Sequence, residues 1–229
     1  MILDVVWFLL SGVCHQIPEH SLAIGGQTLP LCARCTGTFL GVPAGLLTLW
    51  AAGEGRRSGM PRGAIWLVLA LPLAAWALDG ANSFVSEVIG RAWLYAPSNV
   101  LRLVTGTGFG LVLSVLLYPT IHYAMGRQAC EEPVLGRPRI VAVLPLAGCA
   151  LVVALLVEPG APFMFWAIVL AAAAIGVLAL VNGIMIILVL NKEGTAKTWV
   201  SAAPYAAAGL TAALAEMGVL ALVRHVVLG

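Results

Sequence analysis

The sequence predicts an all-α membrane protein: a polytopic transmembrane helical bundle of about seven spans, with six spans and a short first segment as the alternative. Of the 229 residues, 61% are hydrophobic and only 10% are charged, whereas soluble domains carry about 25% charged residues. The mean hydropathy is +1.01. The apolar residues form continuous runs rather than alternating, which indicates helices, since a chain in lipid must satisfy its backbone within helices or a closed barrel.

Each apolar run is compared with the roughly 20 residues that a helix needs to cross a bilayer. The first run is short for a span, and the sixth and seventh are long enough that they should tilt. Asp4 is the only charge in the first run, so it lacks the positive start of a signal peptide and is expected to be retained. No internal repeat divides the chain, so we expect one integral membrane domain over 1–229. The expected segments are 1–14, 32–52, 63–81, 99–120, 139–157, 162–190 and 199–227.

Lysine and arginine predict the orientation, because they are enriched in cytoplasmic loops. Eight of the twelve basic residues follow segments two, four and six: Arg56, Arg57, Arg62, Arg127, Arg137, Arg139, Lys192 and Lys197. The opposite side holds Arg34, Arg91, Arg102 and Arg224. We therefore expect a prokaryotic cytoplasmic membrane protein with its N-terminus inside and its C-terminus outside. A net charge of +2 gives no reason to expect a nucleic-acid partner.

A group of cysteines and histidines falls near the outer face in this orientation. Cys14 and His15 end the first segment, His20 follows, and Cys32 and Cys35 open the second. Three thiols and one histidine are the ligand set of a tetrahedral zinc site, and residues three apart share a helix face. Adjacent ligands on one ion need non-helical backbone, so His15 and His20 both stand as candidates for the fourth ligand.

Two other interpretations compete with a zinc site that takes part in catalysis. The CxxC pair would act as a thiol–disulfide oxidoreductase working with a quinone, since a helix N-terminus and Arg34 would lower the pKa of Cys32. Three outer cysteines leave one unpaired, however, which suits a metal better. The other interpretation is a purely structural clip, either a zinc ion or a disulfide, between the first two helices. Cys130 and Cys149 lie elsewhere in the chain and are not expected to take part.

A second polar group is expected across segments three and four, also toward the outer side. Asp79 and Asn82 share one helical face with Ser83 and Ser86, while Asn99 and Arg102 share another with Gly106. Ionisable groups at membrane depth are costly unless paired and often mark function. Asp79 and Arg102 are expected to be partners, as a structural ion pair or in a polar pocket. In the pocket, Arg102 would hold an anionic group and Asp79 would act as a general base or a further metal ligand.

Segment two also carries Gly37, Gly41 and Gly45, spaced by four. This spacing lets helices approach closely. At about 100° per residue the glycines point roughly 150° away from the two cysteines of the segment. We expect the glycine face to pack against another helix and the opposite face to present the thiols.

Two strings of residues resemble those of a known family. The first runs from Cys14-His15-Gln16 to Pro30-Leu-Cys32-Ala-Arg-Cys35-Thr-Gly37, and the second from Asp79-Gly80 to Ser98-Asn99-x-x-Arg102-x-x-Thr105-Gly106. Together they resemble the prokaryotic membrane family named domain of unknown function 2085 over about the first 110 residues. The family often has a basic residue before the serine where this chain has His20 and Ser21, so the role of His20 stays open. The resemblance implies that these positions form one functional site, and it implies no reaction.

The leading hypothesis is a membrane metal protein, with zinc beside a polar intramembrane pocket, acting as a hydrolase or transferase on a lipid-linked or anionic substrate. The metal ligands would be Cys14, Cys32 and Cys35 with His15 or His20, and the catalytic residues Asp79, Asn82, Asn99 and Arg102. The alternatives are the thiol–disulfide oxidoreductase and a metal-ion transporter or metal-handling protein. Transport would need a polar path across the bilayer, yet the inner halves of the expected helices hold few polar residues beyond Asn182.

Overall fold

The computed structural model describes residues 2–55, 57–126, 130–157 and 162–228, and long helices form where the sequence has its long apolar runs. Most helix boundaries agree with the expected segments within a few residues. The exceptions are the third and fourth helices, which extend beyond their expected ends at 81 and 120. The helices are α1 (Ile2–Ser11), α2 (Ala33–Ala51), α3 (Ile65–Ile89), α4 (Asn99–Met125), α5 (Pro138–Leu156), α6 (Phe163–Val189) and α7 (Trp199–Leu228).

The longer α3 has a clear physical cause. Its extra turns bury Asn82, Ser83 and Ser86 on the same face as Asp79, so the polar groups of these turns have protein around them rather than lipid. The helix ends at Gly90, whose φ of +66° is the left-handed conformation that glycine adopts readily at a helix C-terminus. The expected shared face of these four residues is therefore confirmed.

The count of about seven spans is not confirmed. Within the described part of the chain, five helices are long and apolar enough to cross a membrane, namely α3, α4, α5, α6 and residues Val200–Val227 of α7. Helix α2 has 19 residues but is less apolar than these five. Helix α1 has only 10 residues, which makes it about 15 Å long against a hydrocarbon core of about 30 Å.

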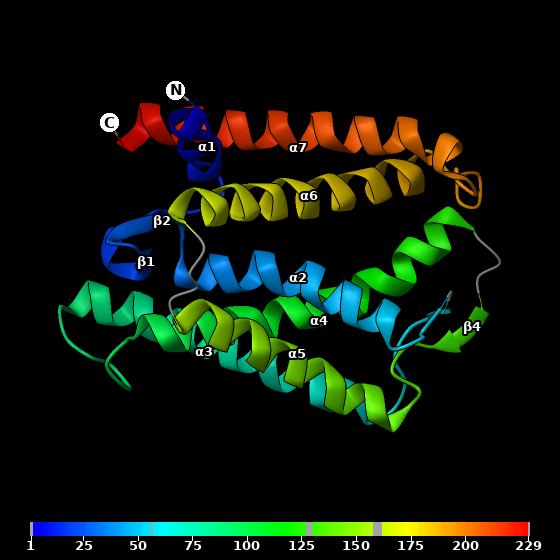
Figure 1. Cartoon of the computed structure of the whole chain (residues 1–229), viewed down its shortest axis with the longest axis horizontal. Coiled ribbons are helices and arrows are strands. Elements are labelled where there is room, and N and C mark those ends of the chain that lie inside the picture. Colours follow the sequence, from blue (N-terminus) through cyan, green and yellow to red (C-terminus); the bar gives the residue numbers. More distant parts are fainter. Residues whose placement is uncertain (1, 56, 127–129, 158–161, 229) are drawn as a thin grey trace.

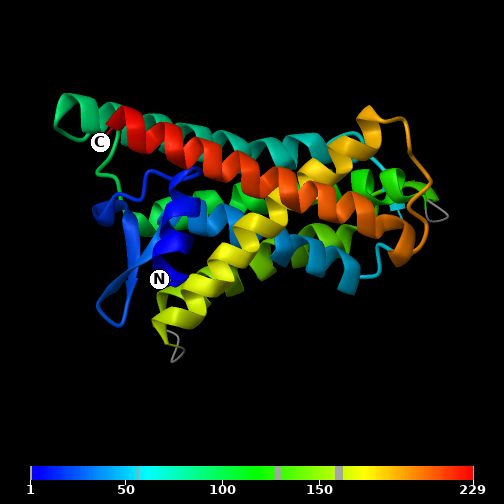
Figure 2. The same cartoon turned by 90° about the horizontal axis from the view of Figure 1, so that it is seen from above.

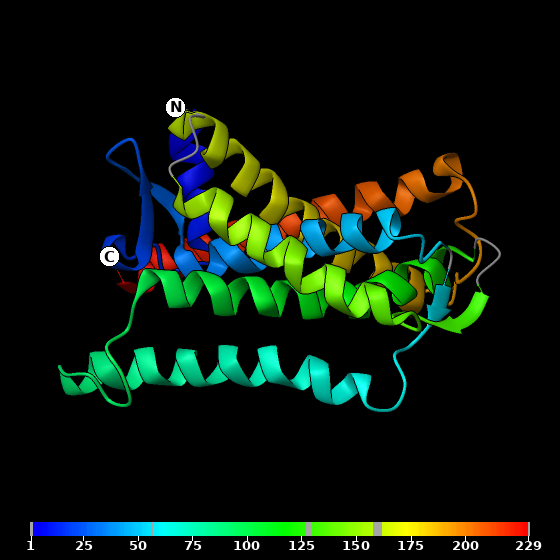
Figure 3. The ribbon, with the colours of Figure 1, turned by 60° about the horizontal axis from the view of Figure 1, so that its bottom comes forward.

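Helices α2 to α7 run along the long axis of the molecule and alternate in direction (Figure 1). Helix α2 lies in the middle and contacts α4, α5 and α6. Helix α3 lies at one edge and packs against α4 (Figure 3). Helices α6 and α7 pack against each other and cross at an angle (Figure 2). Helix α1 sits at one end of this bundle against α7, near the C-terminal end of the chain (Figure 1).

Close contact between α2 and α4 holds the centre of the bundle together. A Cβ atom added at Gly37 would lie 2.5 Å from the carbonyl oxygen of Leu103, and one at Gly41 would lie 2.8 Å from that of Thr107. From the other side, a Cβ at Gly106 would lie 2.2 Å from the carbonyl oxygen of Arg34. The backbones can approach this closely only because these residues have no side chain. The glycine face of α2 thus packs against a helix, as expected.

A β-hairpin occupies the stretch that the sequence analysis treated as a loop. A short 3-10 turn, η1 (Pro18–His20), leads into β1 (Ser21–Ile24), which pairs antiparallel with β2 (Gln27–Cys32). Gly25 and Gly26 form the turn, both with positive φ. Ser21 lies opposite Cys32 in the register, so the hairpin brings the residues after η1 back to the start of α2.

The opposite end of the bundle carries the loops that follow α2, α4 and α6 (Figure 1). There β3 (Arg57–Gly59) pairs parallel with β4 (Cys130–Pro133). The buried carboxylate of Glu54 accepts a 2.8 Å hydrogen bond from the N–H of Leu135 and pairs with Arg57. Of the basic residues used to predict orientation, Arg56 and Arg127 lie outside the described residues, as does the stretch 158–161 between the fifth and sixth expected segments.

Candidate metal centre

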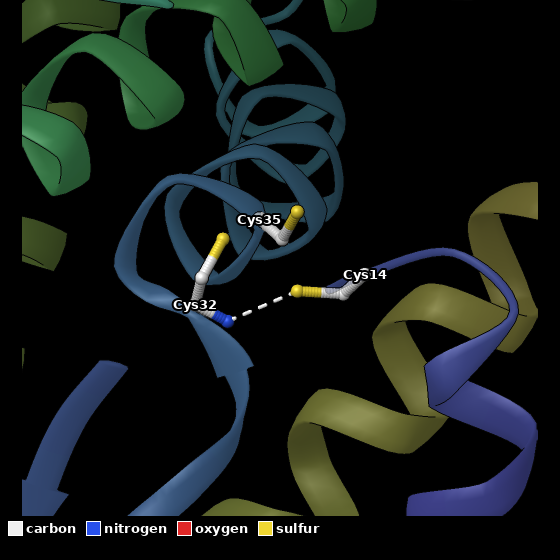
Figure 4. A group of neighbouring side chains, drawn as sticks. All are labelled: Cys14, Cys32 and Cys35. Carbon is white, nitrogen blue, oxygen red and sulfur yellow. Dashed lines mark hydrogen bonds between the residues drawn. The ribbon is translucent and has the colours of Figure 1, made fainter. Parts of the chain in front are cut away.

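Three cysteine thiols meet at the end of the bundle that carries α1 and the hairpin. Cys14 follows α1, Cys32 ends β2 and caps the N-terminus of α2, and Cys35 lies in the first turn of α2. Their sulfur atoms all lie within 4.8 Å of one another (Figure 4). Cys14 is buried and the other two are half-buried. The sequence expectation that these three residues share one site is thus borne out in its geometry.

Two side chains hold the segment that carries Cys14 in place. Arg224 of α7 donates hydrogen bonds from its guanidinium to the carbonyl oxygens of Ser11, Cys14 and His15. The amide of Gln16 donates 3.0 Å hydrogen bonds to the carbonyl oxygens of Trp7 and Pro30, which links α1 to β2. Gln16 itself has a φ of +53°. The chain therefore turns sharply after Cys14 and is fastened on both sides of the turn.

The thiols also interact with each other. The backbone N–H of Cys32 donates a 3.2 Å hydrogen bond to the Sγ atom of Cys14. The hydrogen bond between the two side chains raises the pKa of the Cys14 thiol and, together with one involving Cys35, lowers the pKa of the Cys32 thiol. Hydrogen bonds to a thiolate favour the charged form. Cys32 is therefore the thiol of the group that loses its proton most readily.

The three sulfur atoms suit a soft divalent cation. Zinc binds thiolate at about 2.3 Å in a tetrahedron, which places its sulfur ligands about 3.8 Å apart. A triangle with all sides under 4.8 Å reaches that spacing with small side-chain rotations. The described residues hold the three cysteines as free thiols. The three thiols can thus hold a metal ion, and they would fill three of the four coordination positions of a tetrahedral zinc ion.

Neither histidine candidate joins this group among the described residues. His15 is exposed, and its carbonyl oxygen accepts a hydrogen bond from Arg224. His20 is half-buried and comes directly before Ser21, the residue opposite Cys32 in the hairpin. Burial and then the charge of Arg102 lower the pKa of His20. His20 thus lies one residue from the strand position that faces Cys32, with the neutral form of its ring favoured.

The expected pairing of Asp79 with Arg102 is corrected by the structure. Asp79 is only 1% exposed, and its carboxylate pairs with the guanidinium of Arg34. It also accepts hydrogen bonds from the Tyr95 hydroxyl at 3.0 Å and the Thr105 hydroxyl at 3.3 Å. Arg34 sits in the first turn of α2, whose close packing on α4 brings its side chain across to α3. From the sequence, Arg34 was expected on the outer side and as a neighbour of Cys32, and its pairing with Asp79 was not predicted.

The two asparagines of the expected pocket hold backbone segments. Asn82 accepts a 2.9 Å hydrogen bond from the N–H of Leu94 and donates one of 3.0 Å to the carbonyl oxygen of Tyr95. The Asn99 amide donates to the carbonyl oxygens of Glu19 and Ser21, at 2.9 and 3.2 Å. Asn82 thus fixes the loop after α3, and Asn99 fixes the two residues that flank His20.

Arg102 differs from Arg34 in having few partners. Its side chain is buried, with the residue only 6% exposed. Its guanidinium donates one 2.9 Å hydrogen bond, to the side-chain oxygen of Asn99. No carboxylate oxygen lies within 4.0 Å of it in the described parts of the chain. Arg102 is thus a buried cation with most of its hydrogen-bond donors unused among the described residues, and its charge acts on His20 and Cys32.

Comparison with known proteins finds a family whose model matches the part of the chain that carries most of these residues. Residues 14–116 match the family described as "Predicted membrane protein (DUF2085)". This confirms the resemblance that the two residue strings carry. The DUF2085 match includes the three thiols, Arg34, Asp79 and Arg102, whereas Arg224 lies beyond it.

Two archaeal proteins are also similar to this chain in sequence. An uncharacterized protein of Methanocaldococcus jannaschii is 29% identical over 113 residues, which is 48% of this chain and 66% of that protein, just under two thirds of its length. An uncharacterized protein of Methanothermobacter thermautotrophicus is 29% identical over 104 residues, which is 45% of this chain and 83% of that protein. No solved structure matches this chain.

Proposed function

We propose that this protein binds zinc at the extracytoplasmic face of the membrane and is a metal-dependent hydrolase or transferase acting on an anionic, lipid-linked substrate. The observation that carries the metal site is the meeting of three thiols from two separate chain segments within 4.8 Å. Arg224 and Gln16 hold Cys14 in that position with five hydrogen bonds to backbone oxygens. Such a fastening is what a preorganised ligand set needs.

The proposed orientation puts the thiols outside. Helices α2 to α7 would cross as one membrane domain, because α5 and α6 pack directly on α2. The basic residues Arg57, Arg62, Arg137, Lys192 and Lys197 belong to the end opposite the thiols, which would be cytoplasmic. Helix α1 is too short to cross and lies beside the end of α7 (Figure 1). Its start would therefore lie outside with the C-terminal end, in place of the expected N-terminus inside.

The fourth metal position decides between a structural and a catalytic role. Three protein thiolates leave one position for a ligand from solvent, substrate or His20. A bound zinc ion with an open position supplies a water whose pKa falls toward neutrality. His20 comes directly before Ser21, which lies opposite Cys32, and its ring, favoured in the neutral form, would accept a proton from that water. These features support hydrolysis or group transfer over a closed structural clip.

Transport has less support among the described residues. The buried polar side chains that lie between the two ends of the bundle thin out toward the cytoplasmic side, with Thr107 and Ser114 of α4 the deepest. A continuous polar path is what an ion pathway across lipid requires. The thiol–disulfide alternative keeps one specific argument, the lowered pKa of Cys32, and the same experiment separates it from metal binding.

Metal analysis of the purified protein tests the proposal. We expect about one zinc per chain in the wild type, and loss of zinc when Cys14, Cys32 or Cys35 is replaced by serine, because each supplies one of the three thiolates. Cys149→Ser is the matched control, since this exposed thiol on α5 is separate from the group. A wild type without zinc, in which two further thiols titrate only after a reductant is added, would reject the metal site in favour of a disulfide.

A further inference from the structure

Arg102 is a buried cation that has no counter-ion among the residues that the structure describes. The one buried carboxylate nearby, Asp79, is already paired with Arg34. Arg34 also donates to the carbonyl oxygen of Asp79 and to the hydroxyl of Ser83, so its guanidinium is well satisfied. Arg102 keeps a single hydrogen bond to Asn99. An unpaired charge away from water is costly, which indicates that Arg102 has a partner outside the chain.

The charged and titratable groups around Arg102 determine the electrostatic environment of such a partner. Arg34 repels its charge, while Asp79, Cys32 and Glu87 attract it. Of these three acids, Asp79 is paired, Cys32 belongs to the thiol group, and Glu87 is exposed and more than 4.0 Å away. His20 belongs to the segment that leads into the hairpin, and the charge of Arg102 acts on its ring. None of them occupies the donors of the guanidinium.

The position of Arg102 adds a second positive contribution. It lies in the first turn of α4, a helix of 27 residues that begins at the outer end of the bundle. The N-terminus of a helix carries a partial positive charge and free N–H groups, which favour anions. Asn99 lies in the same turn and is itself held by the backbone on both sides of His20. The guanidinium of Arg102 and the N-terminus of α4 thus lie together, and Asn99 fastens them to the hairpin.

We infer that Arg102, which Asn99 holds in the first turn of α4, binds a phosphate group at the outer surface of the bilayer. A guanidinium fork matches the oxygen atoms of a phosphate and can donate two parallel hydrogen bonds. The headgroup layer of a membrane offers phosphates at this depth. As a step in catalysis this inference rests on the proposed function, since the phosphate would place a lipid-linked substrate beside the metal. As a binding site it stands by itself.

Phosphate binding to protein in nanodiscs tests the inference. Inorganic phosphate is titrated into wild type and variants in phosphatidylcholine nanodiscs, and lipid retained from phosphatidylglycerol nanodiscs is read by native mass spectrometry. Arg102→Gln is expected to weaken binding about tenfold or more, the size typical of a lost charged hydrogen bond. Glu87→Gln should tighten it, because a competing negative charge is removed. Arg91→Gln, on an exposed arginine of the next loop, should leave it unchanged.

The outcomes separate the sources of the phosphate and the two proposals. Phosphate binding that needs Arg102 without retained phosphatidylglycerol identifies a soluble phosphate compound, while retention that Arg102→Gln abolishes identifies a lipid headgroup. Arg102→Lys, which keeps the charge but loses the fork, should weaken binding too, and it replaces Arg102→Gln if that variant does not fold. Zinc is measured on every sample. A wild type that binds neither probe, or an Arg102→Gln variant that binds phosphate as tightly as the wild type, overturns the inference. A zinc-free wild type that still binds phosphate through Arg102 overturns only the proposed function.

Discussion

Replacing Asp79 by alanine is expected to lower the free energy of unfolding by about 3 kcal/mol, because removing one partner of a buried ion pair leaves the other charge uncompensated. Asp79 is 1% exposed and is the only carboxylate that pairs with Arg34 among the described residues. The Arg34 side chain is 20% exposed, so water offsets part of the loss and places the effect at the low end of the usual range. Denaturant titration of the detergent-purified protein measures it.

Two further variants show whether the missing charge is the cause. Asp79→Asn keeps an oxygen that can accept from the hydroxyls of Tyr95 and Thr105, so it should cost less than the alanine variant. The double variant Arg34→Met and Asp79→Leu removes both charges and should be more stable than Asp79→Ala alone. An Asp79→Ala protein as stable as the wild type would mean that the Arg34–Asp79 pair does not hold α2 against α3.

Replacing Gly106 by alanine is expected to destabilise the protein by about 1–3 kcal/mol, because overpacking forces the surrounding backbone to move. The added Cβ would lie 2.2 Å from the carbonyl oxygen of Arg34, an atom that cannot rotate away. Arg34 lies in the same turn of α2 as Cys35. The shift therefore also moves a thiol, and the variant should hold less zinc than the wild type.

Gly176→Ala is the matched control for this prediction. Gly176 lies inside α6 with nothing within 4 Å of an added Cβ, and alanine favours a helix over glycine by about 1 kcal/mol in general. Thermal unfolding should show this control at or above wild-type stability, with its zinc retained. Equal stability of the two variants would contradict the close packing of α2 on α4.

The sequence predicted the helices well because the apolar run is a strong signal in a membrane protein. The ends of α2, α5, α6 and α7 agree within a few residues. The first segment was less well described, since ten helical residues and a hairpin stand where a short span and a loop were expected. In a stretch too short to cross a bilayer, the pattern of apolar and polar residues does not distinguish a strand from a loop.

The site was predicted in its residues more than in its contacts. The spacing of Cys14, Cys32 and Cys35 was enough to predict that the thiols lie together. The 17 residues between Cys14 and Cys32 can bring their two ends together, either as a hairpin or as any other short loop. The pairing of Asp79 was not predictable in this way. Arg34 and Arg102 both carry the right charge, and only the packing of α2 on α4 decides which of them reaches the carboxylate.

The role of Arg224 was missed for a related reason. A single arginine near the end of an apolar helix predicts only that this residue lies at the membrane surface. Its hydrogen bonds to the carbonyl oxygens of Ser11, Cys14 and His15 span more than 200 residues of sequence. One signal was available in retrospect, namely that a lone cation beside apolar helices usually has a specific partner.

X-ray absorption at the zinc edge of the purified protein tests the central claim most directly, because it reports the ligands of the metal rather than its presence. The account predicts three sulfur ligands at about 2.3 Å and one nitrogen or oxygen ligand at about 2.0 Å. In Cys32→Ser, any zinc that remains bound should have fewer sulfur ligands. In Cys149→Ser, the spectrum should equal that of the wild type. A wild-type spectrum without sulfur ligands, or a protein that takes up no zinc with its thiols reduced, would contradict a metal centre at Cys14, Cys32 and Cys35.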